Sequence, residues 1–464
     1  MTTRRGPRLC SVHPRLLVPF GLLASAWPSV AQPPTREPQS APQAEPAPEP
    51  VLRLRLTPAT DPVKPLAFDI GAPVPAKGEW FEIEPPDSTE AELDELYEPH
   101  VGIIRIPLLD DIGEFFRTGG ERLEDATGLR LGFAYTMVFL QASAGPGDRS
   151  GASGDIDFLG DWTFLGRGTS DTGRLIFSAE YRFRAGSQPA SAVGPEIGVI
   201  SAPIGGFNDR GWAWRDLHYQ QRLLDDHLRL LLGRADPSEI VGSYRMQSIN
   251  NSFMNRAFSA NAPIPFPGHG ITASVTARPS DDFYATIGAS NGYGRTTLIT
   301  IDQLFEEWDL FYFAEAGYTP DIHGTLSGRY AVTLWYMDSR PELSLPSDRG
   351  ISLIAEQDLS DWLYAFARYS YADEALERIR NTFQVGAGVR GLLGSPDNLA
   401  GLAFGFIDPR NEDLRDEKVI ELFQRFQLTR HSELTLDGQF IIDPASASGD
   451  DALFVFGVRY RLAF

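Results

Sequence analysis

The sequence has little of what an enzyme or a helical membrane protein needs. It contains one cysteine, Cys10, in 464 residues, and no run of about 18 apolar residues that would form a transmembrane helix. It also lacks the H-E-x-x-H, G-x-S-x-G and P-loop patterns, and its seven histidines are scattered. We therefore expect no enzymatic activity, no cofactor and no metal site.

The 41 lysines and arginines are outnumbered by 62 acidic residues, which gives a formal net charge of −21. The first 31 residues resemble a secretory signal peptide, with four arginines before a short apolar segment, Leu16–Trp27, and small residues at Ser29-Val30-Ala31. Removing this segment takes away those four arginines and Cys10 but no acid, so the net charge falls to about −25. A basic surface for nucleic acid is absent, and the secreted chain has no thiol.

The last fourteen residues, 451–464, read D-A-L-F-V-F-G-V-R-Y-R-L-A-F. Every second residue from Phe454 to Phe464 is apolar, and Arg459 and Arg461 lie on the opposite face. A period of two predicts a β-strand. An apolar row opposite arginines is typical of a membrane barrel with a wet interior. The alternative is the edge strand of a soluble sandwich.

From residue 127 onward, segments of this kind alternate with turns. Sixteen strands are predicted, at 128–141, 154–166, 173–185, 210–223, 227–235, 269–278, 282–290, 308–319, 323–337, 349–357, 361–372, 380–392, 398–408, 417–429, 432–443 and 451–464. Tight turns alternate with long polar loops, as in outer-membrane barrels. A propeller would need a blade repeat of about 40 residues, which is missing. We predict an all-β fold, a transmembrane antiparallel barrel over 127–464.

Residues 32–126 are expected to form a disordered or partly helical periplasmic extension. Gln32–Pro50 is rich in proline, alanine, glutamate and glutamine, which is typical of a linker. Strand-like segments at Val51–Leu56 and Trp80–Ile83 and an acidic patch at Glu90–Glu98 have no clear interpretation. Leu108–Asp125 predicts one helix at the periplasmic mouth of the barrel, and a plain surface helix is the alternative.

Several blocks of sequence resemble one known family. They include TGLRLGFAYTMVFLQ at 127–141, DIDFLGDWTFLG at 155–166, DLHYQQRLLDDHLRLLLGRADPSEIVG at 216–242, NSFMNRA at 251–257, VIELFQRFQL at 419–428, QFIIDP at 439–444 and FGVRYRL at 456–462. In this order they resemble the OprB carbohydrate-selective porin family. The resemblance implies a sixteen-stranded outer-membrane porin that passes sugars passively, usually as a homotrimer. The extension at 32–126 departs from the family.

Candidate pore residues come from the third long loop and the barrel wall. The loop, Ala235–His269, is the longest, and we expect it to fold inward; covering the outer mouth or a subunit contact is the alternative. Its candidates for hydrogen bonds to sugar hydroxyls are Arg245, Asn250, Asn251, Asn255 and Arg256. Alternation points Glu180, Arg182, Arg184, Glu315, Arg329, Arg368, Glu421, Arg425, Arg459 and Arg461 into the lumen. For each of these the alternative is a structural ion pair. Trp212 and Trp214 are placed either on sugar rings or in an outer interface belt.

The predicted function is passive diffusion of small, glucose-like carbohydrates through the outer membrane of a Gram-negative bacterium. Carbohydrates and membrane lipids are the expected partners, with no nucleic acid. One alternative is a general or differently selective porin. Another is an outer-membrane anchor that binds peptidoglycan or a periplasmic partner through residues 32–126.

Overall fold

The computed structural model describes residues 57–58, 85–297, 307–322, 326–447 and 449–464. The predicted signal peptide, the linker at 32–50 and the strand-like segments at 51–56 and 80–83 lie outside the described residues. All described residues belong to one unit, Leu54–Phe464. Within these ranges no helix combines the length and the apolar character needed to cross a membrane.

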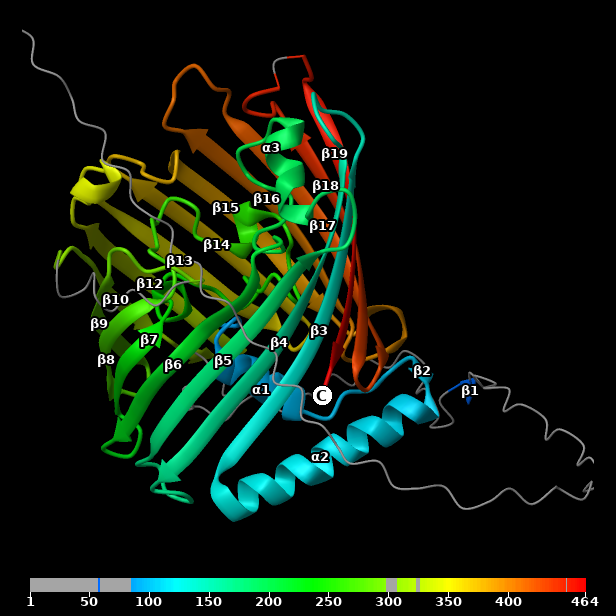
Figure 1. The fold of residues 1–464 in the computed structure, drawn as a ribbon, viewed down its shortest axis with the longest axis vertical. Helices are drawn as coiled ribbons and strands as arrows, with labels where there is room; N and C mark the ends of the chain where they lie inside the picture. The colour runs from blue at the N-terminus through cyan, green and yellow to red at the C-terminus, as the bar shows by residue number, and fades with distance from the viewer. Residues whose placement is uncertain (1–56, 59–84, 298–306, 323–325, 448) are drawn as a thin grey trace, which may run out of the picture. The chain divides into compact units, whose positions relative to one another are not determined.

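Sixteen antiparallel strands form a closed barrel (Figure 1). They are β3 (Leu129–Ala142), β4 (Ser150–Leu165), β5 (Gly173–Arg184), β6 (Gly211–Leu223), β7 (Leu228–Ala235), β8 (Gly270–Ser280), β9 (Phe283–Asn291), β10 (Leu310–Tyr318), β12 (Leu326–Met337), β13 (Asp348–Ser360), β14 (Leu363–Ala372), β15 (Ile379–Arg390), β16 (Leu399–Pro409), β17 (Glu417–Thr429), β18 (Ser432–Ile442) and β19 (Ala452–Ala463). The short β11 (Asp321–Ile322) pairs with β12. β19 closes the barrel against β3, from Val455↔Ala142 to Ala463↔Ala134. The predicted fold class is confirmed.

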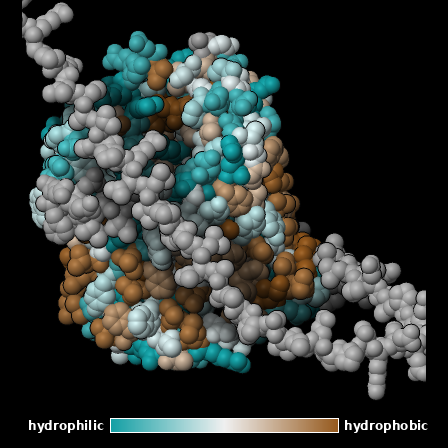
Figure 2. Space-filling view, viewed as in Figure 1, coloured by the Kyte–Doolittle hydropathy of each residue, from teal (hydrophilic) through white to brown (hydrophobic). Residues whose placement is uncertain are grey.

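Alternation gives each strand an apolar outer face and a polar inner face. On β19, Phe454 and Phe456 are exposed, whereas Arg459 and Arg461 are buried. Figure 2 shows hydrophobic residues gathered over the strands in the lower part of the view and hydrophilic residues over the loops above. An apolar belt around a polar interior is the arrangement of a barrel in lipid.

The remaining elements are short except for one helix. They are β1 (Thr57–Pro58), paired with β2 (Ile104–Arg105); α1 (Thr89–Tyr97); α2 (Pro107–Thr127); α3 (Val193–Ile197); α4 (Arg256–Ser259); and 3-10 turns at Ala190–Ala192, Pro237–Glu239, Pro341–Leu343 and Leu392–Gly394. α2 contains the whole predicted helix 108–125 and ends at Gly128, whose φ of 77° is the left-handed conformation of a helix C-cap. Its Phe116 ring lies 5.5 Å from the ring of Phe464. The acidic patch at 90–98, by contrast, forms α1, which was not predicted.

The largest buried hydrophobic cluster lies inside the barrel. It joins the loop between β5 and β6 (185–210) and the loop between β7 and β8 (236–269), called loop 3 here, to inward side chains of the wall. Ile197 and Phe207 of the first loop and Phe253 and Phe258 of loop 3 are fully buried in this cluster. The lumen is therefore partly filled by the chain itself.

Candidate functional site in the barrel lumen

Loop 3 folds into the lumen, as its length predicts. The ring of Phe253 lies 4.9 Å from that of Phe423 on β17 and 6.0 Å from that of Phe366 on β14. The ring of Tyr244 lies 4.4 Å from that of Phe366. Burying these rings against the wall fixes the course of the loop, because each removes a large apolar area from water.

Carboxylates of the wall accept hydrogen bonds from loop 3 amides. Glu421 accepts from the backbone N–H of Met254 and Asn255 at 2.6 and 3.1 Å. The backbone N–H groups of Gly242 and Arg245 donate to Glu315 and Glu356 at 2.8 and 3.0 Å. An irregular buried loop has no ladder to satisfy its amides, so these carboxylates take that place.

Guanidinium groups of the wall donate hydrogen bonds to backbone carbonyl groups of loop 3. Arg329 donates to Ser243 O at 3.0 Å, and Arg368 donates to Ala257 O at 3.1 Å and to Ala260 O. Arg459 donates to Ile249 O at 2.6 Å and to Ser252 O at 2.9 Å. Glu315, Arg329, Arg368 and Arg459 therefore point inward but are buried beneath loop 3, which corrects their assignment to the open pore lining.

A β-bulge in β6 changes which of its side chains face the lumen. The register between β5 and β6 shifts beside Arg215 and Asp216, so both side chains point inward and both are buried. Trp212 and Trp214 then face outward, with 62 % and 59 % of their surface exposed, and Trp212 stacks 6.0 Å from Phe158. Of their two predicted placements, the one on sugar rings in the pore is wrong, because the bulge shifts the alternation by one residue. They lie in the outer aromatic belt.

A cavity of about 210 Å³ lies between loop 3, the inner wall and the segment that begins α1. Three arginines reach it, each with an acidic partner: Arg215 donates to Glu239 at 2.5 Å, Arg256 to Glu377 at 2.7 Å, and Arg182 to Asp155 at 2.7 Å. The amides of Gln247, Asn250 and Asn261 and the side chain of Phe266 also line the cavity. The cavity thus combines planar donors, acceptors and one flat apolar face.

The family model described as "Carbohydrate-selective porin, OprB family" matches residues 183–464, which includes loop 3 and most of the cavity. The chain belongs to the OprB family. It is therefore an outer-membrane porin.

Individual relatives are distant. Porin AaxA of Chlamydia muridarum is 23 % identical over 302 residues, and that of Chlamydia trachomatis serovar D is 23 % identical over 301 residues. Each alignment covers 63 % of this chain and 65 % of the relative, so the chain spans just under two thirds of these relatives. The structure of Pseudomonas putida OprB at high pH is similar at a TM-score of 0.61 and 17 % identity, over 75 % of this chain and 96 % of that one, which shows a shared fold.

Of the predicted site residues, Arg182, Asn250 and Arg256 line the porin's cavity. Glu180 is buried beside it and pairs with Arg182 at 2.9 Å and with Arg210. Arg184 is exposed at the end of β5 and donates to Ser187 O at 3.3 Å. Of these four charged groups, Arg182 and Arg256 line the cavity, Glu180 is linked to it through Arg182, and Arg184 has no contact with it.

The remaining predicted residues are engaged elsewhere in the lumen. Arg245 lies over the ring of Tyr364 at 4.3 Å and pairs with Asp358 at 3.0 Å. Asn255 is fully buried as the N-cap of α4, so its assignment to the pore surface is corrected. Asn251 donates to Glu95 of α1 at 2.6 Å, and Arg425 pairs with the same carboxylate at 3.3 Å.

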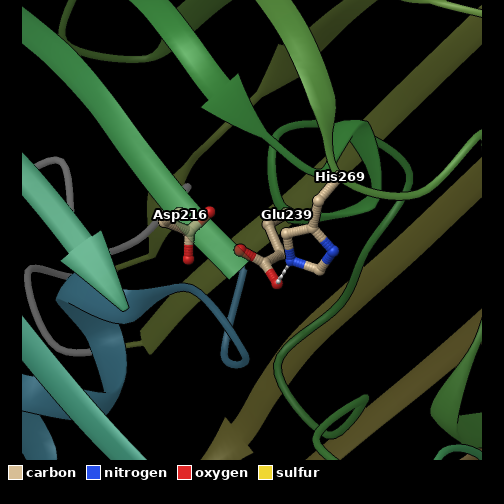
Figure 3. A group of neighbouring side chains, drawn as sticks. All are labelled: Asp216, Glu239 and His269. Carbon is tan, nitrogen blue, oxygen red and sulfur yellow. Dashed lines mark ion pairs between the residues drawn. The ribbon is translucent and has the colours of Figure 1, made fainter. Parts of the chain in front are cut away.

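Asp216, Glu239 and His269 form a cluster with metal-ligand spacing, with ligand atoms within 4.8 Å of one another (Figure 3). His269 Nε2 lies 3.7 Å from Glu239 Oε1, and burial lowers the pKa of His269 to about 4 against the pull of Asp236 and Asp216. Asp216 already accepts from Thr89 and Ser178, and Arg215 donates to Glu239. Because arginine supplies the positive charge, the donor set fits a hydrogen-bonded ion-pair network better than a cation site.

Sequence reasoning missed the cavity residues that depend on the bulge or on loop conformation. Arg215 follows two tryptophans at an outward position of the simple alternation, and only the bulge turns it inward. The adjacent charges Arg215 and Asp216 were the available signal, because two consecutive charges interrupt alternation. Glu239, Gln247 and Glu377 lie on loops, where no periodicity predicts orientation.

Proposed function

We propose that this porin carries small, glucose-like carbohydrates by passive diffusion across the outer membrane of a Gram-negative bacterium into the periplasm. The cavity between loop 3 and β5–β6 supports this proposal most directly. Sugar hydroxyls need both donors and acceptors, and sugar rings need a flat apolar face. The donors and acceptors are present in two ion pairs, Arg215 with Glu239 and Arg256 with Glu377. The apolar side chain is that of Phe266.

Charge balance and size support a small neutral solute. Each cavity arginine is paired with a carboxylate, so neither sign of ion meets a strong uncompensated field. A volume of about 210 Å³ is smaller than the several hundred Å³ of a drug-sized site, which suits one sugar ring better than an oligosaccharide. No energy source is needed, because a concentration gradient drives flow through such a site.

The test is ion conductance of the purified full-length protein in planar bilayers with glucose titrated in. Glucose is expected to reduce conductance in a saturable way. Arg256→Ala should weaken this block roughly tenfold, because it removes a charged hydrogen-bond donor from the cavity. Arg410→Ala is the matched control, since Arg410 also pairs with a glutamate, Glu374 at 3.0 Å, but in an exposed loop pair. If no sugar reduced the conductance, the proposed sugar site would be ruled out and the alternative of a general porin would remain.

The outer-membrane anchor is the second candidate, and one surface favours it. On α2, Phe115 is 75 % exposed and Leu108 is also exposed, which leaves apolar groups beside the barrel open to a partner. Deleting residues 32–84 keeps α1 and α2 and removes the rest of the predicted extension. Loss of envelope attachment with unchanged glucose block would assign residues 32–84 to anchoring. The same loss in Leu108→Ser with Phe115→Ser would assign anchoring to the exposed face of α2. The proposed function also includes assembly as a homotrimer, which a mass measurement of the detergent-solubilised protein tests.

A further inference from the structure

α1 is a short acidic helix enclosed by the barrel. Ser88 caps it by accepting from Ala91 N–H at 3.2 Å, and Glu90 and Glu92 lie in its first turn, where the helix dipole favours negative charge. Glu90, Glu92 and Leu93 are all buried. A helix of nine residues is not stable alone in water, so α1 depends on the lumen that surrounds it.

The carboxylates of α1 meet a set of arginines on the inner wall. The pairs and their N–O distances are Asp94–Arg130 at 2.6 Å, Glu92–Arg461 at 3.1 Å and Glu95–Arg425 at 3.3 Å, and Arg215 lies 3.7 Å from Glu92. These arginines belong to β17, β19, β3 and β6, which all lie on the arc of the barrel that runs from β17 through β18, β19, β3, β4 and β5 to β6. The carboxylates of one helix thus form ion pairs with arginines from strands that are far apart in sequence.

Shape complements charge at Gly132 on β3. A Cβ atom at this position would lie 2.7 Å from Leu96 Cδ1 and 2.8 Å from Leu93 Cδ2. Glycine therefore lets α1 approach the wall closely. On its other side, α1 touches loop 3 through the hydrogen bond from Asn251 to Glu95. α1 fills the space between the wall and loop 3.

The attachment of α1 differs from that of a wall element. Its backbone groups are bonded within the helix, and it meets the wall through side chains. The segment that follows is tied more firmly, because Ile103 N–H donates to Gln427 O at 2.9 Å and Val101 N–H donates to Asp397 at 2.6 Å. If α1 left the lumen, water would solvate its carboxylates and the arginines that pair with them. No backbone–backbone hydrogen bond between residues 89–97 and the wall would be lost.

We propose that α1 is a plug, an acidic helix of the chain itself that occupies the lumen by pairing with wall arginines and whose displacement opens the channel. A helix is about 10 Å wide, and a sixteen-stranded barrel otherwise leaves an aqueous channel. Among the residues that the structure describes, α1 and loop 3 both lie inside the barrel and narrow this channel. This inference goes beyond sugar transport, because it predicts that displacement of α1 raises ion conductance whether or not sugar is present.

The first experiment neutralises the plug in the full-length protein. Glu92→Gln, Asp94→Asn and Glu95→Gln together remove four ion pairs with little change in shape. Single-channel conductance in planar bilayers should rise about twofold or more. The matched control is Glu114→Gln with Glu121→Gln, two exposed acids on α2 that pair with Arg117. The proposal would be overturned if the triple variant conducted like the control.

A crosslink separates displacement of the plug from misfolding. Leu96→Cys with Gly132→Cys is added to the triple variant, because a Cβ at position 132 would lie 2.7 Å from Leu96 Cδ1 and the expected secreted chain has no other cysteine. Leu93→Ala accompanies the pair, since Leu93 Cδ2 would lie only 2.8 Å from the new Cβ. Oxidation should hold α1 in place and return conductance to the wild-type level, and reduction should raise it again in the same sample. Equal conductance in the two states, with the disulfide shown by mass spectrometry, would make α1 a fixed part of the barrel.

Discussion

Loop 3 and α1 both lie inside the barrel, yet the wall holds them differently. The backbone of loop 3 is bonded to wall side chains such as Glu421 and Arg459, and its aromatic rings are buried. α1 keeps its backbone bonds within the helix and offers the wall mainly carboxylates. Removing loop 3 would orphan buried polar groups on both sides, whereas removing α1 exposes groups that water solvates well. The difference predicts one permanent and one removable element in the same lumen.

Phe253→Ala should give the largest effect, because it removes the aromatic contacts that hold loop 3 against the wall. Phe253 is fully buried against Phe258, Phe366 and Phe423, and such a truncation costs about 3–5 kcal/mol. Loop 3 should loosen, raise conductance and lose the glucose block. Phe115→Ala on α2, where the ring is exposed, should change none of these. Unchanged conductance and unchanged hydrogen–deuterium exchange in loop 3 would show that the loop does not depend on its aromatic anchor.

Arg459→Met should loosen only loop 3 and Arg461→Met should loosen only α1, and each effect should be smaller than that of Phe253→Ala. Both arginines point inward from β19, two residues apart, but Arg459 donates to the loop 3 carbonyls of Ile249 and Ser252, whereas Arg461 donates to Glu92 of α1 at 3.1 Å. Each lost charged bond costs about 1.5–3 kcal/mol, so exchange should quicken roughly tenfold or more in the affected segment.

The readout for this pair is hydrogen–deuterium exchange by segment. Arg459→Met should quicken exchange in residues 249–255 and leave 89–97 unchanged, and Arg461→Met should do the reverse. Wild-type protein supplies the baseline for both. If either substitution loosened both segments to the same extent, loop 3 and α1 would form one cooperative unit, and the distinction between them would fail.

The barrel was predictable because its signal is local. Alternation along each strand, as in β19, reports the two faces directly, and all sixteen strands lie close to the predicted segments. The inward course of loop 3 followed from its length alone. The bulge in β6 was missed because the spacing of Trp212 and Trp214 continues a simple alternation that the backbone then breaks at Arg215.

The plug was not predictable for a different reason. Glu92 and Arg461 are 369 residues apart, so no local pattern in the acidic patch shows what it pairs with. The wall arginines were expected in the lumen, but their partners depend on which segments enter it. Arg368 and Arg425 look equivalent in the alternating pattern, yet one holds loop 3 and the other holds α1.

The smallest predicted effect is a dependence of the plug on pH through Asp87, which precedes α1. Burial and the charge of Glu92 raise the pKa of Asp87 to about 6, against Ser248, Arg215 and Arg461, which lower it. The docked state disfavours the charged carboxylate. Docking is therefore unaffected below pH about 4, weakens as pH rises from about 4 to about 6, and stays weaker above that.

Asp87→Asn isolates this effect from Glu95, whose titration acts in the opposite direction. Burial opposes the charge of Glu95, but Arg425, Arg461, His100 and Asn251 together hold its pKa below the ordinary value, so its contribution to docking is lost as pH falls. The ratio of wild-type to Asp87→Asn conductance should therefore rise between pH 4 and pH 6 and then level off. Asp111→Asn, on an exposed part of α2, is the control. A ratio that stays constant across this range would show that Asp87 does not sense whether α1 is docked.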